Sequence, residues 1–147
     1  MEKNDTQNFT VKRVTRFSKN TLRDVNHLLS QWYGKSYAMR PAYLKLLVKS
    51  SYLLAICDGN RIIGMVTLIG MRKVSGYKGS IEHLIVDEAY RGKGLGKKLM
   101  ASAMALAKKL HMAGLALTCE PHRVAANVLY KKLGFATQDS KVYYRKL

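Results

Sequence analysis

Apolar residues recur along the first third of the chain with the spacing of one strand followed by two helices. Residues 9–16 predict the strand. Between residues 22 and 32 apolar positions return every three or four residues, which predicts a helix with one buried face. Pro41 can occupy the first turn of a second helix, whose inner face includes Leu44 and Val48.

The middle of the chain carries a hairpin signal. Two apolar runs, Tyr52–Cys57 and Arg61–Met71, flank the turn sequence Asp58-Gly59-Asn60. A turn over residues 73–79 and a further strand over 80–86 follow. The remaining expected elements are a long helix that ends near Leu110, a strand at Leu115–Thr118, a helix at Val124–Leu133, and closing strands at Phe135–Ala136 and Val142–Arg145.

A glycine-rich segment, Arg91 to Gly96, lies between the strand over 80–86 and the long helix. Glycine lets the backbone turn tightly and lets a ligand approach its N–H groups. The first turn of a helix offers unpaired N–H donors at the positive end of the helix dipole. Lys93 and Lys97 add positive charge. The segment therefore predicts a site for a phosphate-bearing ligand.

The spacing within this segment excludes two common phosphate loops. A Walker loop ends in Gly-Lys-Ser/Thr, whereas Gly96 and Lys97 are followed by Lys98, so no hydroxyl is available for magnesium. A dinucleotide fingerprint needs G-x-G-x-x-G and an acidic residue about 20 positions later. The glycines here are too closely spaced, and residues 110–118 include no acidic side chain.

Composition places the chain among soluble globular proteins. Its 147 residues, of which 48% are hydrophobic and 24% charged, suit one domain over residues 1–147. No apolar run reaches the roughly 20 residues of a membrane span. Met1–Asp5 lacks the apolar core of a signal peptide, so we expect a cytoplasmic protein. The 26 Lys and Arg against 9 Asp and Glu give a net charge of +17, which attracts anions.

Three segments together resemble the GCN5-related N-acetyltransferase (GNAT) family. Arg91 to Gly96 fits the pattern Arg/Gln-x-x-Gly-x-Gly/Ala. Glu82 to Asp87 precedes it at the usual distance, and Asn127 to Phe135 is similar to the family's A-x-x-L-Y-x-x-x-G-F ending. The resemblance implies an α/β (α+β) fold over the full chain. That fold is a single domain with a central mixed, mostly antiparallel, twisted sheet of about 6–7 strands, splayed at strands 4 and 5 and flanked by about four helices.

The resemblance also implies how acetyl-CoA binds as a co-substrate, without a metal. In the family, pantetheine fills the gap between the splayed strands, and main-chain amides of the glycine loop hold the pyrophosphate. An unpaired strand edge suits a ligand that carries amides of its own. The residues expected to bind the cofactor are Leu84, Ile85, Val86, Arg91, Gly92, Lys93, Gly94, Leu95, Gly96, Lys97 and Asn127.

Two residues are expected to carry the proton transfers. The resemblance places the Tyr130 hydroxyl near the CoA sulfur, where a protonated phenol can donate to the departing thiolate. An amine acceptor must lose a proton before it attacks, and Glu82 is the candidate base. His83 is its neighbour, and adjacent strand residues face opposite sides unless a bulge intervenes. Many relatives carry Asn seven residues before the tyrosine; Arg123 stands there in this chain, and Asn127 is the alternative contact.

We therefore expect an acetyl-CoA-dependent N-acetyltransferase that acts on a primary amine by direct transfer. Two alternatives stay open: a basic nucleic-acid-binding module, for which no helix-turn-helix, zinc or RNP-type signature is found, and a non-catalytic protein of this fold that binds acyl-CoA. The aromatic and cationic residues expected around the acceptor suit a small amine that carries an anionic group, or an acidic protein N-terminus. We expect a monomer or a homodimer and no membrane partner.

Overall fold

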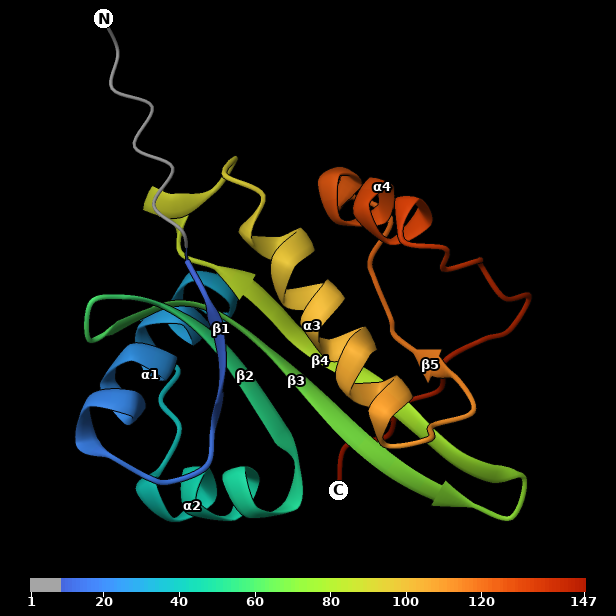
Figure 1. Ribbon diagram of the computed structural model, residues 1–147, viewed down its shortest axis with the longest axis horizontal. Coiled ribbons are helices and arrows are strands. Elements are labelled where there is room, and N and C mark those ends of the chain that lie inside the picture. The colour runs from blue at the N-terminus through green and yellow to red at the C-terminus, as the bar shows by residue number, and fades with distance from the viewer. Residues whose placement is uncertain (1–8) are drawn as a thin grey trace, which may run out of the picture. The chain divides into compact units, whose positions relative to one another are not determined.

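A mixed sheet of five strands, in the order β1-β2-β3-β4-β5, forms the frame of the part of the chain that the structure describes, residues 9–147 of a computed structural model (Figure 1). The first four strands are antiparallel neighbours, and β5 joins β4 in parallel. The elements are β1 (Val11–Val14), α1 (Lys19–Tyr33), α2 (Pro41–Ser50), β2 (Tyr52–Asp58), β3 (Arg61–Lys73), β4 (Gly76–Val86), the 3-10 turn η1 (Glu88–Tyr90), α3 (Leu95–Lys109), β5 (Leu115–Ala116) and α4 (Val124–Lys132).

The described chain divides into two compact units at Leu117. Residues 9–117 hold the whole sheet and the helices α1, α2 and α3, and residues 118–147 hold α4. One domain over the full length stays a prediction. No helix within residues 9–147 combines the length and the apolar character needed to cross a membrane.

Local sequence signals explain where the first elements begin and end. Ser18 caps α1, because its Oγ accepts a hydrogen bond of 3.0 Å from the Thr21 N–H. Pro41 occupies the first turn of α2, as predicted. Gly59 turns the β2–β3 hairpin with a φ of 55°, a backbone conformation that glycine adopts without steric cost. The predicted hairpin is confirmed, with β3 extending to Lys73.

Helices cover both faces of the sheet in residues 9–117. Leu53 and Ala55 of β2 belong to a buried cluster with the inner faces of α1 and α2. Alternate residues of a strand face opposite sides, so the buried side chains of Leu54 and Ile56 lie on the other face. That face is covered by α3, which Figure 1 shows lying across the strands. The buried residues of α3 are Leu95, Leu99, Met100, Ala103 and Ala107.

Gly64 lets α3 approach the sheet closely. A Cβ placed on this residue would lie 3.3 Å from Leu99 Cδ1 and 3.4 Å from the Ile85 carbonyl oxygen. The first distance is tighter than ordinary van der Waals contact, so a larger residue here would force the Leu99 side chain of α3 to shift. The contact matters for the site because α3 begins at the glycine-rich segment.

Two irregularities mark β4. Its pairing with β3 shifts register between the pairs Met65–Ile85 and Thr67–Glu82, so β4 holds one extra residue there. His83, within this bulge, has a φ of 50°. On its other edge β4 pairs with β5 only at Gly79 and Ser80. Beyond Ser80 that edge of β4 is unpaired within residues 9–117, which is the splay expected between strands 4 and 5.

The strand count is lower than predicted. The described chain forms five strands and not 6–7, because the closing strands expected at Phe135–Ala136 and Val142–Arg145 are absent from residues 118–147. Val142, Tyr143 and Tyr144 are 77% to 88% exposed. A strand needs a partner edge and a buried face, and an alternating pattern in the sequence supplies neither. The strand expected at Leu115–Thr118 is also shorter, at Leu115–Ala116.

Candidate functional site

The glycine-rich segment forms an exposed turn that opens α3. Gly92 and Gly94 have φ values of 78° and 73°, and Gly94 is the N-cap of the helix with no side-chain hydrogen bond to cap it. The N–H groups of the first helical turn, from Leu95 to Lys97, donate no hydrogen bond to another described residue. The helix therefore presents open N–H donors at its positive end, together with the exposed side chains of Lys93 and Lys97.

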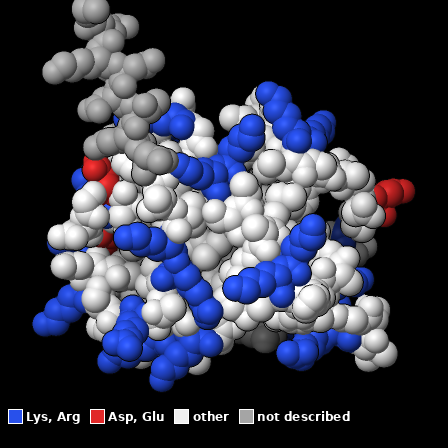
Figure 2. All heavy atoms as spheres, in the orientation of Figure 1, with Lys and Arg blue, Asp and Glu red and all other residues white. Residues whose placement is uncertain are grey.

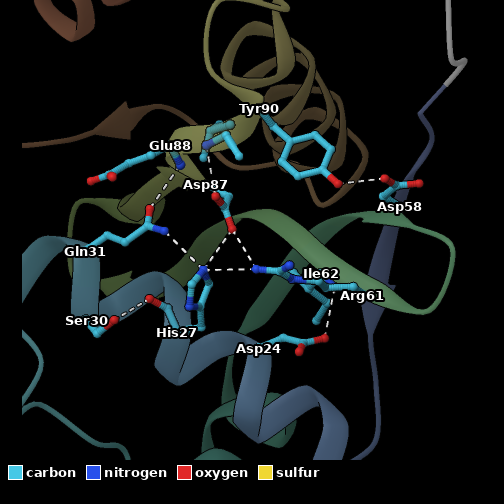
Figure 3. Close-up of polar contacts among 12 residues, drawn as sticks. Asp24, His27, Ser30, Gln31, Asp58, Arg61, Ile62, Asp87, Glu88 and Tyr90 are labelled. Atoms are coloured by element: carbon cyan, nitrogen blue, oxygen red, sulfur yellow. Dashed lines mark hydrogen bonds and ion pairs between the residues drawn. The ribbon is translucent and has the colours of Figure 1, made fainter.

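A polar network anchored on Asp87 holds the segment that leads into this turn (Figure 3). Asp87 is buried at the end of β4, and its Oδ1 accepts a hydrogen bond of 3.1 Å from the Ala89 N–H, which caps η1. Its Oδ2 lies 2.9 Å from His27 Nε2 and 3.1 Å from Arg61 Nη2. In addition, Gln31 Oε1 accepts a hydrogen bond of 3.1 Å from the Glu88 N–H. Helix α1 thus fixes the start of the turn through two side chains.

The chemistry of the network determines where its hydrogens point. His27 Nε2 lies 3.1 Å from nitrogens of Arg61 and Gln31, which donate hydrogen bonds and cannot accept one. The Asp87 carboxylate oxygen can accept, so the hydrogen on His27 Nε2 points to it. Burial alone would raise the pKa of Asp87. The hydrogen bonds from the Ala89 backbone and from His27 outweigh it, so the pKa of this carboxyl lies below its ordinary value.

Asp87→Asn is expected to lower the free energy of unfolding by about 1.5–3 kcal/mol at pH 7, the range for hydrogen bonds to a charged group. The lowered pKa means that the carboxylate stabilises the fold above the unfolded-state pKa of about 3.9, and this contribution is lost as the pH falls through the folded-state value. Urea unfolding at pH 7 and pH 3 should therefore show a smaller difference between variant and wild type at pH 3. The exposed Asp139→Asn is the control; an equal difference at both pH values would contradict the assignment.

The cations beside the glycine turn are positioned by β4 and η1. Arg91 Nε donates a hydrogen bond of 3.1 Å to the Val86 carbonyl oxygen. Lys93 Nζ lies 5.1 Å from the centre of the Tyr90 ring. The Tyr90 hydroxyl donates to Asp58 Oδ2 at 2.7 Å, and this hydrogen bond, followed by burial, raises the pKa of the phenol. The positive charges of Arg91 and Lys93 are therefore held in place by contacts with β4 and η1.

The bulge on β4 brings the predicted base and its neighbour to the same stretch of strand. Glu82 lies opposite Thr67, and its Oε1 accepts a hydrogen bond of 2.5 Å from Ser80 Oγ. His83 Nε2 lies 2.9 Å from the Tyr33 hydroxyl at the C-terminal end of α1. The His83 imidazole on β4 and the Tyr33 phenol on α1 are therefore paired although they lie 50 residues apart in the sequence.

Beyond the bulge, backbone groups alternate between the two edges of β4. Ile85 is buried opposite Met65, and the Asp87 N–H donates to the Ile63 carbonyl at 2.9 Å, so both residues face β3. Leu84 and Val86 occupy the alternate positions, whose N–H and C=O groups face the unpaired edge. Of the three backbone positions predicted to bind pantetheine, two therefore lie on the open edge.

Aromatic side chains gather above the bulge. Trp32 and Tyr33 lie with ring centres 6.5 and 5.9 Å from the His83 ring, and Tyr37 stacks on Tyr33 at 4.8 Å. All three are more than a third exposed. The aromatic cluster, defined as Trp32, Tyr33, Tyr37 and His83, thus offers a surface of rings at the bulge of β4.

The second unit holds Tyr130 and Asn127 on α4. The Tyr130 and Phe135 rings meet edge to face at 6.1 Å. Burial, followed by Cys119, raises the pKa of Tyr130, so its hydroxyl keeps its proton at neutral pH. The Asn127 amide donates at 3.0 Å to the carbonyl oxygens of both Glu120 and Arg123. Asn127 therefore fixes the loop before α4.

The predicted residues thus fall into two groups. Residues 82, 84–86 and 91–97 follow one another along β4 and into α3, while Asn127 and Tyr130 lie in residues 118–147. Reasoning from the sequence missed His27 and Arg61, and it placed Tyr33 among the aromatic residues around the acceptor without its contact with His83. Asp87 carried a usable signal, since an Asp just before a turn is a common helix cap.

Positive charge is spread over the face of the molecule seen in Figure 2, and no metal site is found among residues 9–147. Figure 2 shows Lys and Arg side chains distributed over the viewed face, with few Asp or Glu. In the part of the chain that the structure describes, no group of three or more His, Cys, Asp or Glu side chains could hold a metal ion. The electrostatics favour an anionic ligand.

Comparison with known proteins gives concordant matches. The model of the acetyltransferase (GNAT) family matches residues 22–135. A Drosophila melanogaster protein named "Probable glucosamine 6-phosphate N-acetyltransferase" is 32% identical over 79 residues, which are 52% of this chain and 35% of that protein. The match thus spans about a third of the length of this relative.

Solved structures share the fold. An aminoglycoside acetyltransferase from an uncultured soil metagenomic sample, in complex with trehalose, has a TM-score of 0.84 at 16% identity, with 95% of this chain and 96% of that chain covered. Glucosamine-6-phosphate N-acetyltransferase from Arabidopsis thaliana has a TM-score of 0.77 at 19% identity, with 93% and 97% covered. At these identities the likeness shows the fold alone.

Proposed function

Because the chain belongs to the acetyltransferase (GNAT) family, we propose that it is an acetyl-CoA-dependent N-acetyltransferase that transfers the acetyl group directly to a primary amine. One observation carries the proposal. The unpaired edge of β4 runs toward a helix end whose first-turn N–H groups have no acceptor among the described residues. A ligand with amides followed by phosphates matches this order of groups.

The residues proposed to bind acetyl-CoA contact different parts of the cofactor. Backbone groups of Leu84 and Val86 meet the pantetheine amides, with Ile85 between them as a buried anchor. The turn from Gly92 to Gly96 holds the pyrophosphate with main-chain N–H groups, since φ values of 78° and 73° at its glycines shape the backbone. Arg91, Lys93 and Lys97 add charge, and Asn127 acts by holding the loop before α4.

The transfer needs three contributions from the protein. A base removes a proton from the acceptor ammonium, so that the neutral nitrogen attacks the thioester carbonyl. A main-chain donor, for which the Val86 N–H is the candidate, stabilises the oxygen as it gains negative charge. Tyr130, whose pKa is raised by burial and Cys119, gives its proton to the departing thiolate. Glu82 and His83 are the two groups on β4 that can take the proton.

The acceptor is proposed to be a small primary amine that carries an anionic group. The names of similar proteins include glucosamine 6-phosphate and aminoglycosides as substrates. The net charge of +17 favours the former, since a phosphate is attracted and a polycation repelled. The aromatic cluster can pack against the face of a sugar ring.

Two measurements test the function. Isothermal titration should show acetyl-CoA binding at tens of micromolar or tighter. A thiol-release assay with a panel of amines should show turnover, with glucosamine 6-phosphate acetylated better than spermidine. Binding without turnover of any amine would identify an acyl-CoA-binding protein. Absence of binding would refute the proposal, and a preference for spermidine would refute only the charge argument.

A further inference from the structure

We infer that His83, oriented by Tyr33, is the group that takes the proton from the acceptor amine. The inference rests on the proposed acetyl transfer and names one catalytic residue within it. It begins from the bulge on β4, where an extra residue interrupts the pairing with β3. Bulges re-aim side chains, and they are common next to active sites.

The backbone of His83 supports this assignment. Its φ of 50° lies in the left-handed region, which residues other than glycine seldom adopt. In a regular strand His83 and Glu82 would face opposite sides. The left-handed residue turns His83 toward the C-terminal end of α1, where its ring contacts Trp32 and Tyr33. The strand therefore presents an imidazole beside the C-terminal end of α1, on the stretch of β4 whose edge toward β5 is unpaired.

The hydrogen bond to Tyr33 leaves one ring nitrogen available. Nε2 lies 2.9 Å from the Tyr33 hydroxyl oxygen, while Nδ1 makes no hydrogen bond to another residue of the described range 9–147. We assign the hydrogen to Nε2, which donates to the Tyr33 oxygen, so Nδ1 keeps its lone pair. When Nδ1 takes a proton, the same Nε2–H bond to Tyr33 persists and stabilises the charged ring. Tyr33 is thus a positioning residue for His83.

Glu82 is placed less favourably for this task. Its Oε1 already accepts a hydrogen bond of 2.5 Å from Ser80 Oγ, and the residue sits in register with Thr67, before the bulge. Ser80 lies on the same strand, so the bond ties the carboxylate back along β4. We therefore assign Glu82 a structural role in the strand, and we assign His83 the role of accepting the proton from the amine.

The proposed transfer accounts for every proton and every bond. The acceptor ammonium gives one proton to His83 Nδ1, and the nitrogen lone pair forms a bond to the thioester carbonyl carbon. The carbon–sulfur bond then breaks, its electron pair stays on sulfur, and Tyr130 supplies the proton that makes the thiol. The amide nitrogen loses its second proton to solvent, and His83 and Tyr130 return to their starting states by exchange with water.

His83→Asn tests the assignment, because Asn tolerates a positive φ nearly as well as His. His111 also has a positive φ, at 57°, so His111→Asn is the matched control for backbone effects. With glucosamine 6-phosphate, 2-phenylethylamine and spermidine, His83→Asn should lower kcat about 100-fold, the scale of general base catalysis. The Kd for acetyl-CoA should stay unchanged, which also shows that the variant is folded. His111→Asn should match wild type.

Hydroxylamine, which is neutral at assay pH, separates a base from a structural residue. Because it needs no proton removed before attack, His83→Asn should lose less than about 5-fold with hydroxylamine. Tyr33→Phe should lower kcat about 10-fold with unchanged acceptor KM, the size of one lost hydrogen bond to a charged group, while the exposed Tyr43→Phe should have no effect. Glu82→Gln should lower kcat less than His83→Asn does.

The outcomes distinguish this inference from the proposed function. If wild type releases thiol with none of these nucleophiles, the acetyltransferase proposal fails and the assignment of His83 fails with it. If wild type is active and His83→Asn stays within 2-fold of it, or loses equally with hydroxylamine and the amines, only the assignment of His83 is wrong. A larger loss in Glu82→Gln than in His83→Asn would return the base to Glu82.

Discussion

Tyr130→Phe is expected to lower kcat about 100-fold while the Kd for acetyl-CoA changes little, the low end of the range for a general acid. The phenol is the proposed proton donor to the thiolate, and burial followed by Cys119 keeps its pKa above the ordinary value. Phenylalanine preserves the ring and its edge-to-face contact with Phe135 at 6.1 Å. The change therefore removes the proton and leaves the packing. Steady-state thiol release and calorimetric titration measure the two quantities.

Tyr143→Phe is the control, since Tyr143 lies in the same unit and is 88% exposed. It should leave kcat and Kd at wild-type values. The raised pKa of Tyr130 adds a second expectation: because the acid works only while protonated, its loss should limit kcat only above the ordinary phenol value of about 10. An unchanged kcat in Tyr130→Phe would remove the acid role from this residue.

Elements with local signals were predictable from the sequence. The hairpin at Gly59, the proline that opens α2 and the glycine segment that opens α3 each depend on residues close together in the chain. Turn and cap preferences act over about four residues, so reading them does not require the fold. The order of helices and strands up to β5 followed from these signals.

The prediction of closing strands was wrong because strand pairing depends on residues far apart in the chain. The segment Val142–Arg145 alternates in the sequence, but pairing depends on an edge supplied by distant residues, and its large side chains remain exposed. The sequence likewise could not decide whether β4 carries a bulge, because the register of a strand depends on its partner, here β3, as well as on its own residues. Periodicity therefore indicated which residues could form a strand but not whether a partner would accept them.

The side-chain contacts of the candidate site were the least predictable part. His27 and Asp87 are 60 residues apart, and Tyr33 and His83 are 50 apart. Each pair meets only because α1 packs against the end of β4, which is a property of the folded core. The sequence singled out Glu82 and His83 as alternatives; only the bulge and the contact with Tyr33 supply a physical reason to prefer one.

Gly94→Val is expected to raise the Kd for acetyl-CoA about 10- to 100-fold, which corresponds to about 1.4–2.8 kcal/mol. Gly94 has a φ of 73° and caps α3, and a β-branched residue strongly resists a positive φ. The chain would relieve that strain by rotating the backbone of the turn. The first-turn N–H groups would then no longer point together toward one anion.

Gly59→Val separates this effect from simple backbone strain. Gly59 has a φ of 55° in the β2–β3 turn, and a Cβ at either glycine would meet nothing within 4 Å. Both variants should therefore lose a similar free energy of unfolding, about 1–2 kcal/mol for a left-handed residue, while only Gly94→Val should weaken acetyl-CoA binding. Urea unfolding and calorimetric titration compare the two variants. Equal Kd values for the two glycine variants would mean that the pyrophosphate binds elsewhere.

Lys97→Met should weaken acetyl-CoA binding less than Gly94→Val does. An exposed lysine is one screened charge, whereas the turn positions several N–H donors at once.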